Sequence, residues 1–198
     1  PHLKMIDIFK TSISIKKLDV DTKSIQKYCL EQKKKNKGNL ISNAGGWQSK
    51  NLIGEHPVLN DVFIAMEEQT LEFAKEILKP KQYFLKNAWI NINEYRDYNL
   101  AHTHPQCLFS SIFYAKAPID SGNLVFHSYD AEIMGAYWHH EVLNTNIQTG
   151  NIYTVVPEES MLVIFPSFLK HEVSANMNKK ECRISIASNL GKEENRND

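Results

Sequence analysis

The residues best suited to chemistry in this 198-residue sequence are histidines in two separate segments. His102-Thr103-His104-Pro105 lies near the middle of the chain, and His171 follows a strongly apolar run and a proline-containing turn near the end. In extended backbone, residues i and i+2 point to the same face, so His102 and His104 can bind one ion side by side. Pro105 favours this arrangement because it restricts His104 to β or polyproline geometry. With His171 as a third imidazole, the set predicts a metal site.

Two points about this histidine set stay open. Histidines in a loop or a core can be structural and satisfied by hydrogen bonds alone. Imidazole binds iron, copper, nickel and zinc alike, so the ligand type does not name the metal.

An arginine follows the third histidine, in the segment Arg183-Ile184-Ser185-Ile186. In a strand, Arg183 and Ser185 face one way and the two isoleucines face the core. An arginine fork beside a serine hydroxyl is a receptor for a carboxylate. A buried arginine needs an anion beside it, because a buried charge without a partner is costly. That anion is either a bound co-substrate or an acidic residue of the protein in a structural salt bridge.

Two helices are expected in the first third of the chain. The first is capped at Asp21 or Thr22 and runs to the lysines at 33–35, which suit the negative end of a helix dipole. The second opens at Pro57, carries apolar residues at helical spacing and ends at Lys79, before a proline.

From Tyr83 onward the pattern changes to short strands separated by turns, with no helices between them, which indicates an antiparallel sandwich or barrel. The predicted strands cover residues 83–93, 107–115, 122–126, 152–156, 161–165 and 182–188. Residues 127–150 have weak periodicity and predict a loop or lid. Its His139-His140-Glu141 segment is a second metal site, a set of substrate contacts or an exposed loop.

The composition excludes several classes of protein. Hydrophobic residues make up 42% and charged residues 23%, as in ordinary globular domains, and the formal net charge of zero disfavours nucleic acid as a partner. Three widely spaced cysteines argue against a disulfide framework and for a reducing compartment. Without a signal-peptide-like or membrane-spanning apolar run, we expect a cytoplasmic protein.

Seven short segments between Tyr83 and Leu190 also have a characteristic order and spacing. They are Trp89–Asn91, Asn99–Pro105, Ser111–Tyr114, Pro118 with Ser121-Gly122, Leu162–Ser167, His171–Val173 and Arg183–Ile186. Together they resemble the core of the 2-oxoglutarate- and iron(II)-dependent oxygenases. More narrowly, they are similar to a bacterial and phage subfamily related to prolyl hydroxylases.

The resemblance implies a fold and a set of cofactors. The fold is a double-stranded β-helix, a cupin-like jelly roll, over residues 81–190 of a single domain. Residues 1–80 then form a mostly helical flank, and residues 191–198 form a disordered polar tail. The implied cofactors are Fe(II) and 2-oxoglutarate, with O2 as the further co-substrate.

The resemblance also implies roles for individual residues. His102, His104 and His171 would bind the metal, and no catalytic residue is assigned beyond them. Arg183, helped by Ser185, would bind the far carboxylate of 2-oxoglutarate. Candidate polar groups for the same pocket, for which structural roles are equally open, are Asn91, Asn93, Ser111 and Tyr114.

One ligand departs from the pattern of the wider superfamily, which binds iron with HxD…H. His104 stands where those enzymes have the aspartate. Either three imidazoles hold the metal, or a nearby carboxylate such as Asp97 or Asp130 substitutes. Three imidazoles leave the site one negative charge poorer, so we expect weaker iron retention, an altered metal preference or a missing activity.

The leading interpretation is a non-haem iron dioxygenase that uses 2-oxoglutarate and O2 to hydroxylate an unidentified small molecule or protein. Two alternatives stay open: a three-histidine cupin-like metalloenzyme that does not use 2-oxoglutarate, and a catalytically inactive β-barrel binding protein. Neither nucleic acid nor a membrane is expected as a partner, and a homodimer remains open.

Overall fold

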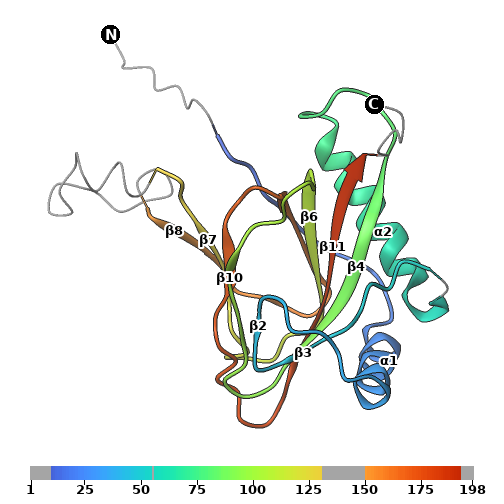
Figure 1. Ribbon diagram of the computed structural model, residues 1–198, viewed down its shortest axis with the longest axis vertical. Helices are drawn as coiled ribbons and strands as arrows, with labels where there is room; N and C mark the ends of the chain where they lie inside the picture. The colour runs from blue at the N-terminus through green and yellow to red at the C-terminus, as the bar shows by residue number, and fades with distance from the viewer. Residues whose placement is uncertain (1–9, 55, 131–149, 193–198) are drawn as a thin grey trace, which may run out of the picture.

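Two antiparallel β-sheets face each other, and two helices cover the outer side of the larger sheet (Figure 1). The computed structural model describes residues 10–54, 56–130 and 150–192. The helices are α1 (Thr22–Lys35) and α2 (Pro57–Ala74). The strands are β1 (Ser14–Lys17), β2 (Asn43–Ala44), β3 (Trp47–Gln48), β4 (Tyr83–Asn93), β5 (Tyr98–His102), β6 (Phe109–Lys116), β7 (Leu124–His127), β8 (Ile152–Val155), β9 (Met161–Pro166), β10 (His171–Val173) and β11 (Arg183–Lys192).

The path of the chain between the sheets defines the fold. The larger sheet has the order β1-β9-β6-β11-β4-β3, and the smaller one has the order β2-β5-β10-β7-β8. From β4 to β7 and again from β8 to β11, consecutive strands alternate between the sheets. This alternation winds the chain as a double-stranded β-helix, so the jelly-roll fold predicted for this region is confirmed.

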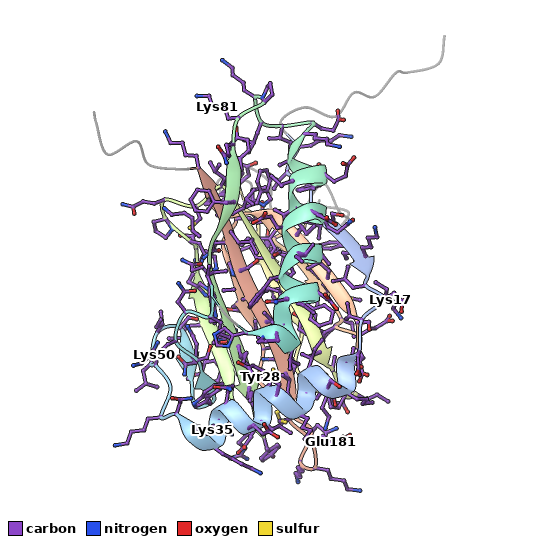
Figure 2. The ribbon with its side chains drawn as sticks, turned by 90° about the vertical axis from the view of Figure 1, so that its right-hand side faces the viewer. Lys17, Tyr28, Lys35, Lys50, Lys81 and Glu181 are labelled. Atoms are coloured by element: carbon purple, nitrogen blue, oxygen red, sulfur yellow. The ribbon has the colours of Figure 1, made fainter. Side chains whose placement is uncertain are left out.

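The helices bury their apolar sides against the outer face of the larger sheet (Figure 2). Asp21 caps α1 by accepting hydrogen bonds from the backbone N–H groups of Lys23 and Ser24, as the capping pattern predicts. The second helix ends at Ala74, earlier than the predicted Lys79. Ile77 continues the apolar spacing but is 54% exposed, so no packing against the sheet extends the helix to it.

The strand β11 separates two apolar clusters. Ile184 and Ile186 belong to the cluster under the helices, whereas Ala187 belongs to the cluster between the sheets. Arg183 and Ser185 alternate with the isoleucines and line a pocket between the sheets. The predicted alternation along this strand is therefore confirmed.

The six predicted strands all exist, and the first matches β4 at both ends. Three short strands in the first 50 residues, together with β5 and β10, were not predicted. These strands have no long alternating pattern of their own, and pairing with neighbours holds them in place. The predicted disordered tail begins too early, because β11 continues through Gly191 to Lys192 in register with β4. Of the proposed lid, residues 131–149 lie outside the described part of the chain, as do residues 193–198 of the tail.

None of the described helices is both long and apolar enough to span a bilayer.

Candidate functional site

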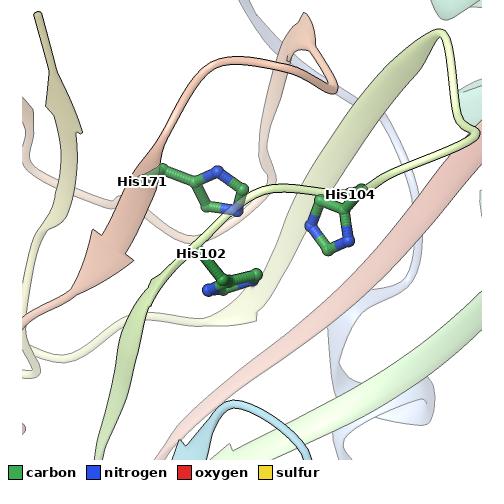
Figure 3. Close-up of side chains that lie close together, drawn as sticks. All are labelled: His102, His104 and His171. Atoms are coloured by element: carbon green, nitrogen blue, oxygen red, sulfur yellow. The ribbon is translucent and has the colours of Figure 1, made fainter. Parts of the chain in front are cut away.

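Three histidine side chains converge between the sheets (Figure 3). His102 ends β5, His171 begins β10, and the two residues are paired in register. His104 lies just beyond β5, where its backbone N–H donates to the carbonyl of Ser167 at 3.0 Å. One ring nitrogen from each histidine lies within 4.8 Å of the others. The predicted grouping of the three imidazoles is therefore present, although β5 ends at His102 and does not include His104.

A β-bulge directs His102 into the pocket. On β10, His171 and Val173 are two residues apart, but their partners on β5, His102 and Asn99, are three apart. The extra residue on β5 turns Asn99 and His102 to the same side, and both line the pocket.

Backbone carbonyls fix the orientation of two rings. The Nδ1 of His102 donates to the carbonyl of Leu100 at 2.6 Å, and the Nδ1 of His171 donates to that of Leu169 at 2.9 Å. Because a carbonyl only accepts, each Nδ1 carries the proton and each Nε2 keeps its lone pair for a metal.

Burial also keeps two of the rings neutral. It lowers the pKa of His104 to about 4 and that of His171 to about 3, and the neighbouring histidines act in the same direction. Near neutral pH these side chains are therefore unprotonated on one nitrogen, as metal ligation requires. Three converging imidazoles fit a divalent transition-metal ion.

Neither alternative carboxylate joins the cluster. Among the residues that the structure describes, the potential ligands brought together are the three histidines, without Asp97 or Asp130. Asp97 instead accepts a hydrogen bond through Oδ2 from the backbone N–H of Glu94 at 2.7 Å.

The histidines share a pocket with five of the six candidate polar residues; Asn93 is not among its lining residues, and its Nδ2 donates to Asn99 Oδ1 at 3.3 Å. The predicted residues that line the pocket are Asn91, Ser111, Tyr114, Arg183 and Ser185. Its remaining described lining residues are Ser42, Trp89, Asn99, Ser110, Ile112, Phe165, Val173, Ala187 and Ser188. Trp89 was not predicted as a site residue, although it precedes Asn91 by two positions on β4 and so shares its face; its ring centroid lies 5.7 Å from that of His104.

Arg183 is buried in the wall of this pocket. It is 1% exposed, and its Nη1 donates to the carbonyl of Ser121 at 2.5 Å. Within the described residues, Arg183 has no carboxylate at salt-bridge distance. Burial lowers its pKa, while Tyr114 and Asp97 act in the opposite direction. The structural salt bridge that was the alternative explanation for Arg183 is therefore missing from the described part of the chain.

Two polar atoms of residues that line the same pocket have no hydrogen-bond partner among the described residues. They are Tyr114 Oη and Asn91 Oδ1, and both are buried. Burial raises the pKa of Tyr114 to about 12, so its hydroxyl is a neutral donor. A buried arginine without a carboxylate partner and a phenol without any partner fit a carboxylate ligand.

The predicted Ser111 is placed differently. Its Oγ is 2.7 Å from Ser188 Oγ in a buried pair, so its hydroxyl is already hydrogen-bonded. Ser110, which was not predicted, also borders the pocket, and its hydroxyl is hydrogen-bonded to Ser167 and Asn189.

Histidines of the proposed lid do not form part of this site in the described structure. His127 ends β7, with its Nε2 3.6 Å from Glu172 Oε2, and is outside the histidine cluster. His139, His140 and Glu141 lie outside the described residues.

Comparison with known families places this geometry in context. A family model described as "Putative 2OG-Fe(II) oxygenase", where 2OG is 2-oxoglutarate, matches residues 87–189, just over half of the chain. The chain belongs to this family of oxygenases. It is therefore an oxidoreductase whose cofactors are Fe(II) and 2-oxoglutarate, as the sequence predicts. No curated protein matches the sequence.

Solved structures of distant sequence share the fold. A prolyl-4-hydroxylase from Pseudomonas putida superposes with a TM-score of 0.66 at 14% identity, covering 93% of this chain and 94% of its own. HygX from Streptomyces hygroscopicus, with nickel and 2-oxoglutarate bound, has a TM-score of 0.63 at 9% identity and covers 91% and 83%. A viral collagen prolyl hydroxylase from Paramecium Bursaria Chlorella virus-1 has a TM-score of 0.54 at 14% identity and covers 89% and 94%.

Proposed function

We propose that this oxygenase is a hydroxylase that binds Fe(II) through His102, His104 and His171 and binds the far carboxylate of 2-oxoglutarate through Arg183. The observation that supports the proposal is a single pocket that contains three converging imidazoles and a buried arginine without an acidic partner among the described residues. One half of this pocket suits a metal ion, and the other half suits an anion.

The side chains have distinct tasks in this proposal. Bound Fe(II) and 2-oxoglutarate supply the activation of O2, with release of succinate and carbon dioxide. Arg183 orients the co-substrate by pairing with its carboxylate, and Tyr114 is a second hydrogen-bond donor. Ser185 lies on the same face of β11 as Arg183. Phe165 and Ile112 form an apolar wall that limits access of water to the reacting atoms.

The substrate presents the C–H bond that is hydroxylated next to the metal site. Three of the structural neighbours are named prolyl hydroxylases, so prolyl peptides are the first substrate class to test. Free amino acids and other small molecules form the second class. Trp89 lies beside His104 and offers a flat apolar surface for either.

The cellular compartment of the protein is also a proposal. All three cysteines, Cys29, Cys107 and Cys182, are unpaired in the structure, which supports a reducing compartment such as the cytoplasm. A homodimer and a single domain spanning residues 1–198 remain predictions.

The test is release of succinate from 2-oxoglutarate by protein loaded with Fe(II) under anaerobic conditions and then exposed to O2. We expect slow release without a substrate and faster release with the correct one. Arg183→Ala should abolish the release and 2-oxoglutarate binding. Arg96→Ala should do neither, because Arg96 is exposed and lies over the Tyr95 ring, away from the pocket. Absence of both 2-oxoglutarate binding and turnover in the wild-type protein would refute the proposal.

A further inference from the structure

The wall of the pocket has an unbalanced charge. Among its described lining residues, Arg183 is a cation and none is an aspartate or glutamate. His102, His104 and His171 bind a metal as neutral ligands, through a lone pair. A divalent ion at the histidines therefore adds two positive charges to a buried space that already contains an arginine.

Two acidic residues near this space, Asp97 and Glu172, do not line the pocket. Asp97 accepts a hydrogen bond from the backbone of Glu94 at 2.7 Å. Glu172 alternates with His171 on β10 and has its Oε2 3.6 Å from His127 Nε2. Asp97 acts electrostatically on Arg183, but neither carboxylate lines the pocket, so neither replaces the missing ligand charge at the histidines.

We propose that the neutral side chain of His104 makes the binding of a divalent metal ion in this pocket depend on 2-oxoglutarate more strongly than a carboxylate ligand at this position would. This inference rests on the proposed function. When 2-oxoglutarate is absent, a metal ion bound at the histidines and the Arg183 side chain repel each other across a low-dielectric space. The 2-oxoglutarate dianion relieves this repulsion at both ends, so each ligand raises the affinity for the other by the same factor.

The coupling is measured with Mn(II), a stable divalent probe, whose free concentration is read from its electron paramagnetic resonance signal. Wild-type protein is titrated with Mn(II) alone and with Mn(II) in saturating 2-oxoglutarate. We expect 2-oxoglutarate to raise the Mn(II) affinity about 100-fold, toward the upper end of known couplings between two ligands. A titration of 2-oxoglutarate with and without Mn(II) should give the same factor.

Two variants of nearly equal size isolate the charge at position 104. His104→Asp supplies a negative ligand, so Mn(II) alone should bind more tightly and the coupling factor should fall at least about tenfold. His104→Asn also removes the imidazole but adds no charge, and its coupling factor should stay within about threefold of the wild-type value.

A second measurement uses the wild-type protein and needs no variant. Glutarate has both carboxylates of 2-oxoglutarate but lacks the keto oxygen that completes a chelate ring. If charge sets the coupling, glutarate should also raise Mn(II) affinity, by about fivefold or more. Glutarate that leaves Mn(II) affinity unchanged would overturn the inference, and so would equal coupling factors in the Asp and Asn variants.

The outcomes separate the two proposals. Metal and 2-oxoglutarate that both bind, but change each other's affinity less than about fivefold, would refute the coupling and leave the proposed function intact. Failure of 2-oxoglutarate to bind under any metal condition would refute both.

Discussion

Gly122→Ala should displace Arg183 and weaken 2-oxoglutarate binding, although Gly122 does not itself line the pocket. Gly122 has a φ of +91°, a conformation that side chains with a Cβ rarely adopt. A Cβ at this position would lie 2.1 Å from the carbonyl oxygen of Ser174 and 2.6 Å from Nη1 of Arg183. Both distances are below contact, so the backbone, the arginine or both must move.

The size of the effect follows from these contacts. Backbone strain at such a position amounts to about 1–3 kcal/mol. Displacing Arg183 also weakens its hydrogen bond to the Ser121 carbonyl, which as a charged bond contributes about 1.5–3 kcal/mol. Together these losses amount to about 2.5–6 kcal/mol, which corresponds to a fall in Tm of roughly 5–24 °C for a chain of this length. Because the guanidinium is moved, 2-oxoglutarate affinity should fall at least about tenfold.

The assay is thermal unfolding together with titration of 2-oxoglutarate in the presence of Mn(II). Gly54→Ala is the matched control, because Gly54 has a φ of +147° but a Cβ there meets no atom within 4 Å. The control should lose some stability and keep its 2-oxoglutarate affinity. If Gly122→Ala keeps both the Tm and the 2-oxoglutarate affinity of the wild type, the account of Arg183 and its packing is wrong.

Three further changes test separate parts of the structure. Tyr114→Phe removes a buried hydroxyl that has no partner among the described residues, so the Tm should not fall. The affinity for 2-oxoglutarate should fall about fivefold, as expected for one lost hydrogen bond. An unchanged affinity would contradict the role of Tyr114. In the folded protein, burial lowers the pKa of His104 to about 4 and that of His171 to about 3. Between pH 6.5 and about 4, these histidines therefore take up protons in the unfolded chain but stay neutral in the folded protein. The Tm of the metal-free protein should therefore fall as the pH falls through this range, and His171→Asn should make the fall smaller; an equal slope in both proteins would be evidence against the buried neutral histidine. Leu59→Ala, in the core under the helices, should lower stability by about 2–5 kcal/mol in denaturant unfolding without changing 2-oxoglutarate affinity, and a change in that affinity would show that the two cores are not independent.

The parts of the fold that could be predicted have strong local patterns. Asp21 and the lysines at 33–35 define both ends of α1, and the alternation along β4 defines that strand. The strands β5 and β10 carry two of the histidines but are short and weakly patterned. They exist because each pairs with the other, across about 70 residues of sequence, which no local pattern reports.

The candidate site was predictable for a different reason. His102, His104, His171 and Arg183 were recognisable by residue type, order and spacing, and the structure brings all four to one pocket. The bulge that turns Asn99 toward the pocket depends on the register between two strands, which the sequence does not display. For the same reason, the pairing of Ser111 with Ser188 could not be anticipated, because these residues meet across β6 and β11.

A crystal structure with Mn(II) and 2-oxoglutarate bound under anaerobic conditions tests the central claim most directly. The account predicts a metal ion bonded to Nε2 of His102, His104 and His171, and a 2-oxoglutarate carboxylate paired with Arg183. A metal ion coordinated by an aspartate or glutamate in place of His104, or an Arg183 that pairs with a protein carboxylate while 2-oxoglutarate lies elsewhere, would contradict it.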